Sequence, residues 1–230
     1  MVRAKLYFKG LKNFEYPYDY DDKFSSLFFT RIKEFKEMVN KFKSFDFFTF
    51  SNFVIEEFDE MDDFFISLNG VVSVVVSSIS EEFLKKFVAF LVDENNLYYD
   101  HNVLFLFKFE FSEDIKFTSN ESNFITVSPI YLKNYPDDND LFSFLENMLI
   151  EKYCRYYQLN KKYVNCKIMT GGSNFQKFTV KTESGEFEDY YYMLDLIIIA
   201  DADVISFAYD VGLGNNTNNG FGMLDLYRGG

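Results

Sequence analysis

Metal-binding and disulfide-forming side chains are scarce in this chain of 230 residues. It has two cysteines, Cys154 and Cys166, and a single histidine, His101. A structural zinc site takes about four Cys or His ligands, and a disulfide framework needs several paired cysteines. The sequence therefore excludes both, and we expect the protein to use no metal and no other cofactor.

Long apolar runs are also absent. Apolar runs such as Val74–Val76 and Leu196–Ala200 are far shorter than the roughly 20 residues that a membrane-spanning helix needs. The N-terminal segment carries charges at positions 3, 5 and 9 and no continuous apolar stretch, so it does not look like a signal peptide. We expect a cytoplasmic protein with no membrane partner.

Positive charge is in the minority, because 23 Lys and Arg face 36 Asp and Glu, for a net charge of -13. This average argues against an anionic partner such as nucleic acid. The distribution is uneven, however. Residues 1–43 hold ten basic and six acidic residues, and residues 152–181 hold seven basic residues and no acid. A run of like charge is often only a solvated face, but thirty residues without one acid favour a phosphate-binding track.

The spacing of apolar residues predicts secondary structure in the first half of the chain. The expected elements are a strand at 5–8, a helix at 24–39, a strand at 45–55, a hairpin at 64–78 that turns at 69–70, a helix capped by Ser80, and a strand region at 97–111. Their order is strand, helix, two strands, helix, strand.

The second half repeats this order. We expect a strand at 124–132, a helix at 141–157, strands near 163–169 and 175–181, a strand at 190–200, a short helix at 201–210 and a last strand at 223–227. The order is that of the ferredoxin-like, or RRM-like, βαββαβ arrangement. The sequence therefore predicts an α+β protein of two tandem ferredoxin-like domains, residues 1–112 and 113–230.

Glycines cluster near the C-terminus, where Gly212, Gly214, Gly220 and Gly222 fall within eleven residues. Such a cluster lets main-chain N–H groups converge on a phosphate, or lets a ligand lie against the backbone. The segment is neither a Walker loop nor a dinucleotide fingerprint, since it lacks their spacing and their place between a strand and a helix. The alternative is a flexible Asn-rich connection.

The residues around these glycines resemble a known family. The run Phe-Ala-Tyr-Asp-Val-Gly-Leu-Gly-Asn-Asn-Thr-Asn-Asn-Gly-Phe-Gly-Met-Leu at 207–224 is similar to the C-terminal signature of the CRISPR-associated repeat-RNA endoribonucleases, the Cas6 family. Tyr16–Tyr20, Thr126–Tyr131 and Leu145–Tyr153 resemble further stretches of the same family. Together these segments reach from one end of the chain to the other in the family's order.

The resemblance implies a protein that binds CRISPR repeat RNA and cuts the precursor transcript once per repeat without a metal ion. In that reaction a ribose 2′-hydroxyl attacks the adjacent phosphate, which leaves a 2′,3′-cyclic phosphate and a 5′-hydroxyl. The step needs a base, an acid for the leaving oxygen and positive charge on the phosphorane.

The three catalytic side chains that the resemblance implies are all replaced in this chain. The family's Tyr, His and Lys positions correspond here to Phe29, Asn40 and Asp46, and none of these can play the usual part. His101 lies in a predicted turn and is no replacement. The remaining catalytic candidates are Lys41, Lys43 and Tyr20, although two lysines near a helix C-terminus are also explained by the helix dipole.

The expected RNA-binding residues come from the glycine-rich segment and the second basic stretch. They are Gly212, Gly214, Asn215, Asn216, Asn218, Gly220, Gly222, Arg155, Lys161, Lys162, Lys167 and Lys177. Four tyrosines, at 153, 156, 157 and 163, are interleaved with the basic stretch. Unpaired bases stack on such rings, whereas tyrosines at helical spacing more often belong to the core, and both interpretations stay open.

Two other functions fit the same sequence. One is a repeat-binding homologue that has lost cleavage and that holds RNA or forms a homodimer with an active copy. The other is a structural subunit of a CRISPR effector complex. The loss of the usual Tyr, His and Lys side chains is the feature that keeps these alternatives open.

Overall fold

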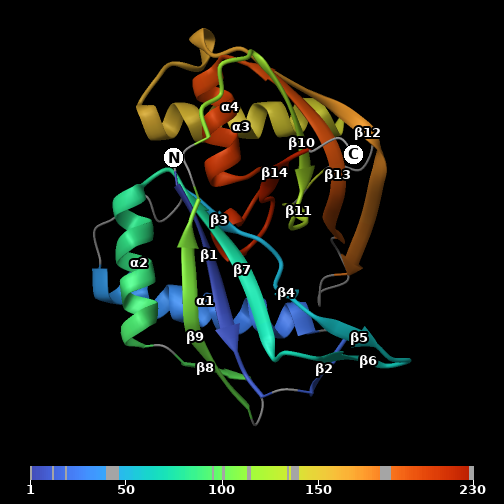
Figure 1. Cartoon of the computed structure of the whole chain (residues 1–230). Helices are drawn as coiled ribbons and strands as arrows, with labels where there is room; N and C mark the ends of the chain where they lie inside the picture. The colour runs from blue at the N-terminus through green and yellow to red at the C-terminus, as the bar shows by residue number, and fades with distance from the viewer. Residues whose placement is uncertain are drawn as a thin grey trace. The chain divides into compact units, whose positions relative to one another are not determined.

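The computed structural model describes residues 2–11, 13–18, 20–39, 47–94, 96–99, 102–112, 115–133, 135, 140–181 and 188–227. The chain divides into two units (Figure 1). The first contains Met1–Asp46 and Phe50–Asp114, and the second contains Phe47–Thr49 and Ile115–Gly230. Each unit is a mixed α/β structure with its own antiparallel sheet.

The main sheet of the first unit has β1 at its centre. Its strands run in the order β3 (Phe48–Phe50), β7 (Val71–Ser78), β1 (Val2–Lys9), β9 (Asn102–Phe111) and β8 (Asn96–Tyr99), and β4 (Val54–Ile55) also pairs with β7. The strand β3 belongs to this sheet by its pairing, although Phe48 and Thr49 are grouped with the second unit. Both neighbours of β1 are antiparallel to it. The predicted strands at 5–8 and 97–111 therefore lie in one sheet.

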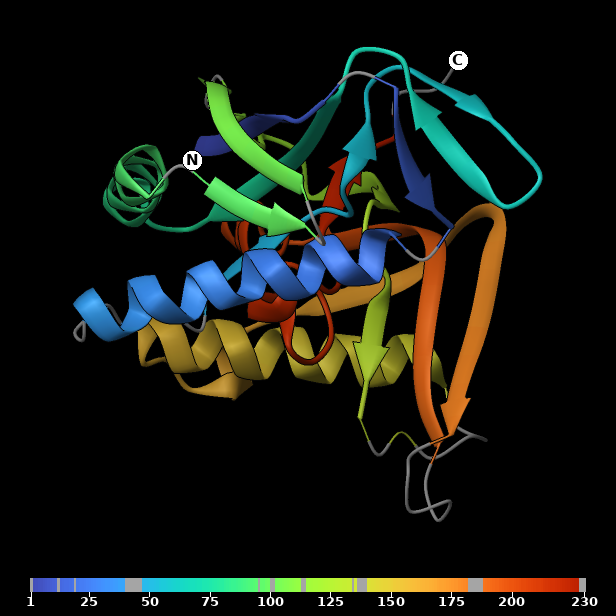
Figure 2. The ribbon, with the colours of Figure 1, turned by 90° about the horizontal axis from the view of Figure 1, so that it is seen from below.

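Two helices, α1 (Tyr20–Val39) and α2 (Glu81–Asp93), cover one face of this sheet. The Phe28 ring of α1 contacts Phe8 of β1 at 6.3 Å and Phe87 of α2 at 5.7 Å between centroids. Beside the sheet edge, α1 runs along β8, where Arg31 Nη2 donates to Asn96 O at 2.6 Å (Figure 2). The spacing of the predicted helix fits this packing, since its buried side chains are Phe24, Phe28, Ile32 and Phe35.

A second, smaller sheet corrects one expectation. It consists of β2 (Phe14–Pro17), β6 (Phe64–Ser67) and β5 (Phe58–Glu60), with β6 in the middle. The turn at Asn69–Gly70 is present, with Gly70 at φ 71°. However, β6 and β7 do not form the predicted hairpin, because β6 pairs in this small sheet and β7 pairs with β1.

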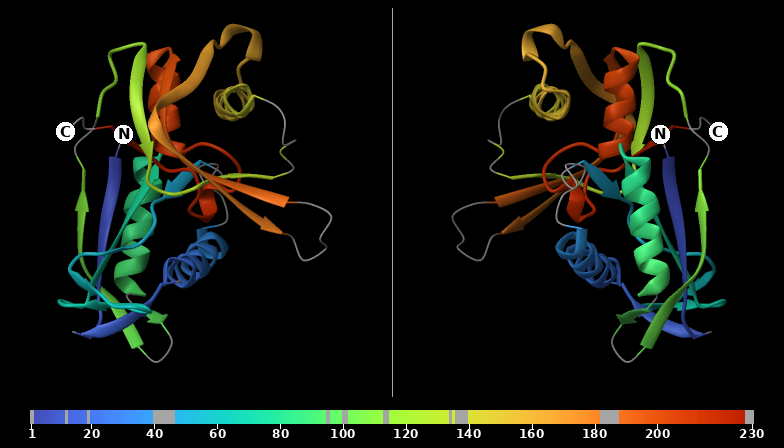
Figure 3. Two further views of the ribbon diagram at one scale, coloured as in Figure 1. Left: turned by 90° about the vertical axis from the view of Figure 1, so that its right-hand side faces the viewer. Right: turned by 90° about the vertical axis from the view of Figure 1, so that its left-hand side faces the viewer.

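The sheet of the second unit runs in the order β11 (Ile130–Leu132), β13 (Glu188–Ala200), β10 (Glu121–Thr126) and β14 (Leu224–Leu226), and β12 (Cys166–Lys181) pairs with β13. The strands β12 and β13 lie side by side over most of their length (Figure 3). The predicted strand at 124–132 is thus two strands, and the two predicted strands between 163 and 181 are one strand with an irregularity.

The helices of the second unit are α3 (Leu141–Tyr157) and α4 (Ala202–Val211). Asp140 begins α3 by accepting hydrogen bonds from Phe142 N at 3.2 Å and Ser143 N at 3.3 Å, which satisfies two free N–H groups of the first turn. Gln158 ends α3 in the left-handed conformation, at φ 58°. No helix in the described residues is long and apolar enough to cross a membrane.

The tandem ferredoxin-like prediction is confirmed by the order and pairing of the elements. The first unit follows β1, α1, β3, β7, α2, β9, and the second follows β10, α3, β12, β13, α4, β14. In each unit the third strand of this series pairs with the first and the second, and the first pairs with the fourth.

Candidate functional site

The glycine-rich segment connects α4 to β14 and has an unusual backbone. Gly212, Gly214, Gly220 and Gly222 all have positive φ, between 67° and 90°. A Cβ on Gly222 would lie 1.8 Å from Leu213 O, and one on Gly212 would lie 2.6 Å from Gly222 O. These positions need glycine for conformation and for space, since the two ends of the segment touch each other.

Hydrogen bonds close the segment and tie it to its own unit. Leu213 N donates to Gly222 O at 2.9 Å, Asn215 N to Tyr131 O at 2.8 Å, and Gly222 N to Pro129 O at 2.8 Å. These N–H groups are used inside the protein and do not point at a ligand. The N–H groups of Leu213, Asn215 and Gly222 are therefore not available to a phosphate, and phosphate binding by other parts of the segment stays a prediction.

A partly buried contact from α3 fixes the middle of the segment. Lys152 Nζ donates to Val211 O at 3.2 Å and to Thr217 Oγ1 at 2.7 Å. Thr217 is buried, whereas its neighbour Asn216 is exposed, and Asn215 and Asn218 are half-buried. Lys152 was not among the residues that the sequence indicated, because no local pattern links it to a threonine 65 positions away.

Three of the expected basic residues lie close together in the sequence at the end of α3 and beyond it. Arg155, Lys161 and Lys162 are all exposed, and the last two belong to a short 3₁₀ helix, Lys161–Tyr163, which Asn160 caps. The Arg155 guanidinium lies 5.3 Å from the centroid of the Phe47 ring, and Lys161 pairs with Glu151.

The structure does not bring Lys167 and Lys177 onto the same face of β12. Lys167 pairs with Ile199 of β13, and Lys177 pairs with Tyr192. Positions 192 and 199 are an odd number of residues apart, so their side chains, and those of the lysines opposite them, point to opposite faces. The cause is the irregularity between Thr170 and Phe175, where β12 advances five residues while β13 advances two.

The four tyrosines differ in exposure. Tyr153 is 9% exposed, Tyr157 is 45% exposed and Tyr163 is 83% exposed, while Tyr156 is half-buried. Tyr153, Tyr156 and Tyr157 also contact Phe207 of α4, with ring centroids 5.3 to 6.1 Å away. These three tyrosines form an aromatic cluster, and Tyr163, directly after two lysines, presents most of its ring to solvent.

Tyr157 and Cys166 of the second unit have raised pKa values. Burial, and then the neighbouring Tyr153, raise the pKa of Tyr157 to about 12. Burial, and then Glu146, raise the pKa of the Cys166 thiol to about 12. At neutral pH both groups keep their protons, so neither serves as a general base or a nucleophile.

The catalytic candidates lie mostly outside the described residues, as do Asn40, Asp46 and His101. Lys41 and Lys43 follow the last described residue of α1, and Tyr20 is its first residue, with a side chain that is not described. Phe29 is described: it is half-buried, and the Lys33 ammonium lies 4.5 Å from the centroid of its ring. In the described part of the chain, no group of three or more His, Cys, Asp and Glu side chains could hold a metal ion.

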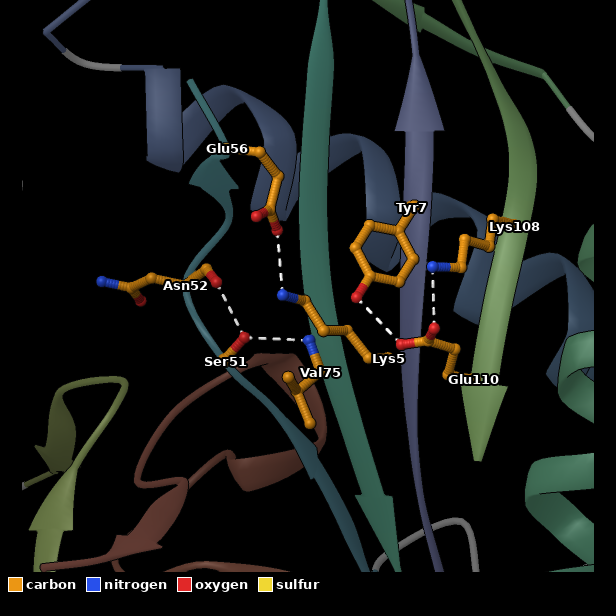
Figure 4. A network of polar contacts seen from close by, with 8 residues as sticks. All are labelled: Lys5, Tyr7, Ser51, Asn52, Glu56, Val75, Lys108 and Glu110. Carbon is orange, nitrogen blue, oxygen red and sulfur yellow. Dashed lines mark hydrogen bonds and ion pairs between the residues drawn. The ribbon is translucent and has the colours of Figure 1, made fainter. Parts of the chain in front are cut away.

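Sequence reasoning missed a charged network on the open face of the first unit's main sheet (Figure 4). Tyr7 Oη donates to Glu110 Oε2 at 3.0 Å, Lys108 Nζ lies 2.7 Å from Glu110 Oε1, and Lys5 Nζ lies 2.9 Å from Glu56 Oε1. The hydrogen bond from Lys108, and then the one from Tyr7, hold the pKa of the Glu110 carboxyl below its usual value. The period-two alternation of polar residues along β1 is the signal that could have revealed this face.

The Lys152 contact makes a first prediction. Lys152→Met leaves Val211 O and Thr217 Oγ1 without their charged donor, so we expect the free energy of unfolding to fall by about 1 to 3 kcal/mol. Urea denaturation followed by circular dichroism measures the change. Thr217→Val should cost less in the Lys152→Met background than alone, because the two residues share one interaction.

The matched control is Lys162→Met, which removes an exposed lysine and should change the free energy by less than about 0.5 kcal/mol. Equal effects of the two lysine substitutions, or additive effects of Lys152→Met and Thr217→Val, would show that the contact between Lys152 and Thr217 does not stabilise the segment.

Comparison with known proteins places this arrangement in a family. The family model described as "CRISPR associated protein Cas6, C-terminal" matches residues 111–226. The chain is 25% identical to "CRISPR-associated endoribonuclease Cas6 1" of Methanocaldococcus jannaschii, over 90% of this chain and 86% of that protein.

Solved structures share the whole fold. One described as "CRISPR associated protein Cas6" has a TM-score of 0.82 at 22% identity and covers 99% of both chains. A second, described as "An RAMP protein binding different RNA substrates", has a TM-score of 0.79 at 18% identity, covering 99% of this chain and 100% of that one. A third, of a Cas6-related gene from Pyrococcus furiosus, has a TM-score of 0.76 at 17% identity, covering 100% and 99%. With its second unit spanned by the family model and its fold shared from end to end, this chain belongs to the Cas6 family of CRISPR-associated proteins.

Proposed function

We propose that this protein binds CRISPR repeat RNA and cleaves the precursor transcript within each repeat, without a metal ion, leaving a 2′,3′-cyclic phosphate and a 5′-hydroxyl. Membership in the Cas6 family carries the proposal. It is supported by the relative from M. jannaschii, which is named an endoribonuclease, and by the concentration of basic residues at 152–181.

The cleavage chemistry takes place within the RNA. The 2′-oxygen forms a bond to phosphorus, the bond from phosphorus to the 5′-oxygen breaks, one proton leaves the 2′-hydroxyl and one reaches the 5′-oxygen. In our proposal Lys41 and Lys43 hold the phosphate in line and stabilise the extra negative charge of the phosphorane. Tyr20 begins α1, and the 20 residues of this helix put it about 30 Å from the end that precedes the two lysines, so Tyr20 has no part in the same step. Because no histidine occupies the family position, we expect a slower reaction, since acid–base help is typically worth about 10² to 10⁴ in rate.

RNA binding is proposed for exposed side chains of the second unit. Arg155 and Lys162 supply charge, the exposed ring of Tyr163 offers a stacking surface, and the amide of Asn216 reaches solvent from the glycine-rich segment. Amides bond phosphate oxygens and base edges without adding charge. The segment therefore contributes selectivity, and the basic residues contribute most of the affinity.

A second candidate function is repeat binding without cleavage. The observation that favours it is Phe29, which stands where the resemblance places a tyrosine, has no hydroxyl and is covered by the Lys33 ammonium. The same assay that tests cleavage decides between the two functions. Failure to bind a repeat more tightly than a scrambled RNA would instead favour a structural subunit of an effector complex.

The cleavage prediction is direct. Purified protein incubated with end-labelled repeat RNA in excess EDTA should release one product per repeat with a cyclic phosphate end, because the proposed reaction uses no metal. A single 2′-deoxy substitution at the cut site should abolish the product while leaving binding in place. Bound but uncut RNA would eliminate the nuclease and leave the repeat-binding homologue.

The catalytic assignment makes a separate prediction. The double variant Lys41→Ala/Lys43→Ala should lower the single-turnover cleavage rate at least about 100-fold, because charge on the phosphorane is lost. The matched control is Lys85→Ala/Lys86→Ala, which removes two adjacent exposed lysines of α2 that pair with Glu81 and Glu82. It should cleave at the rate of the unaltered protein. Unchanged cleavage in the first variant would remove both lysines from the mechanism.

The opposite faces of Lys167 and Lys177 make a prediction about salt. Each phosphate contact to a single strand contributes about 0.7 to the slope of log K against log salt. An RNA strand that follows one face of β12 contacts only one of the two lysines. Comparing Lys167→Ala with Lys177→Ala by titration at several salt concentrations, we expect one variant to lower the slope and the other to leave it unchanged. Equal losses in both would rule out a track along a single face.

A further inference from the structure

A short 3₁₀ turn, Thr217–Asn219, forms the middle of the glycine-rich segment. Gly220 N donates to Thr217 O at 3.0 Å, which closes the turn. Asn216 begins it in the left-handed conformation, at φ 52°. This conformation is less favourable for a residue with a Cβ, and it persists where the surrounding structure holds it. The shape of the turn therefore depends on contacts from outside it.

Lys152 of α3 makes such a contact. Its ammonium donates to Thr217 Oγ1 at 2.7 Å and to Val211 O at 3.2 Å. Val211 is the last residue of α4, and the final carbonyls of a helix lack partners within the helix and carry partial negative charge. One ammonium therefore joins the end of α4, where the segment begins, to the turn at the middle of the segment.

The turn directs its side chains to different sides. Thr217 is 3% exposed, whereas Asn216 is exposed and Asn218 is half-buried. Each asparagine amide offers donors and an acceptor, which can bond base edges and phosphate oxygens. Because a hydrogen bond weakens steeply when its angle changes, selective binding by these amides requires that the turn be held before RNA arrives.

The surroundings of Lys152 differ from those of the proposed phosphate-binding residues. Its side chain is half-buried and its ammonium has two acceptors within the protein, whereas Arg155 and Lys162 are exposed. A lysine that contacts phosphate raises the affinity for any RNA and the salt dependence of binding. A lysine that holds the turn affects only the contacts that the turn makes, so its effect is on selectivity.

We propose that Lys152 is a positioning residue for repeat recognition. By holding Thr217 inward, it presents Asn216 and Asn218 to the repeat in one fixed arrangement. This inference rests on the proposed function, because it takes the glycine-rich segment as an RNA contact. It assigns selectivity to the contact between α3 and the turn, and leaves most of the affinity to the exposed basic residues.

Two variants break the contact in different ways. Lys152→Met removes the ammonium, and Thr217→Val removes the hydroxyl while it leaves every charge in place. Fluorescence anisotropy with labelled repeat RNA and with a scrambled RNA of the same composition gives the ratio of the two affinities. We expect each variant to lower this ratio about tenfold and to leave the affinity for scrambled RNA within about twofold.

Lys162→Met is the matched control, because it removes an exposed lysine of the same unit. It should weaken the binding of both RNAs alike and lower the slope of log K against log salt by about 0.7. Lys152→Met should leave this slope unchanged. Lys152→Arg keeps a donor for Val211 O and Thr217 Oγ1 and should restore the ratio. Circular dichroism checks that every variant is folded at the assay temperature.

Hydrogen exchange of the peptides that cover 212–222, measured without RNA, is a second readout. Exchange should be faster in Lys152→Met and Thr217→Val than in the unaltered chain, because the turn is released. Unchanged exchange in both variants would overturn the proposal. A loss of RNA affinity in Lys152→Met that Thr217→Val does not share would also overturn it, since Lys152 would then contact phosphate directly.

Failure of the proposed function gives a different result. An unaltered chain that binds repeat and scrambled RNA equally would overturn repeat recognition and this proposal with it, and faster exchange in the variants would then leave Lys152 with a structural role alone. A selective unaltered chain whose ratio neither variant lowers would overturn the role of Lys152 and leave the proposed function in place.

Discussion

Burial of one face of the main antiparallel sheet of each unit beneath two helices is the constraint from which the other features follow. Along β1, Ala4, Leu6 and Phe8 point into the core, so Lys5 and Tyr7 must point to the other face. In the first unit phenylalanine side chains fill this buried layer, where rings from strands and helices contact one another. The charged network on the open face is what this alternation leaves outside the core.

The same alternation limits what the second unit offers to a polyanion. Seven basic residues without an acid suggested one continuous track, but an odd number of extra residues in β12 sends Lys167 and Lys177 to opposite faces. Lys161 already forms an ion pair with Glu151, and the Lys152 ammonium donates a hydrogen bond to Thr217 Oγ1 of the glycine-rich segment. A single polyanion strand therefore meets fewer than all seven of these basic side chains.

Much of the fold follows from sequence patterns, and the errors have identifiable causes. The spacing of Phe24, Phe28 and Phe35 gave the buried face of α1, and Ser80 caps α2 with a hydrogen bond from Phe83 N at 3.2 Å. The hairpin at 64–78 was wrong because a turn at Asn69–Gly70 fixes a local change of direction, not the sheet that each strand joins. Strand pairing depends on distant segments, such as β2 for β6, that a local pattern does not contain.

The candidate site was less predictable because its key contacts link residues far apart in the sequence. The glycine cluster was recognised, but the sequence did not show that the backbone of Gly222 meets that of Leu213 or that the N–H groups of Leu213 and Gly222 help to close the segment. Closure places Asn216 outward and Thr217 inward, which makes Lys152 a determinant of the surface that the asparagines present. Because the asparagine amides are neutral, this surface gains little from long-range attraction. In the function proposed above, discrimination between repeats rests on short-range hydrogen bonds, which demand a rigid backbone. The contact of Lys152 with Thr217 and the positive-φ glycines supply that rigidity.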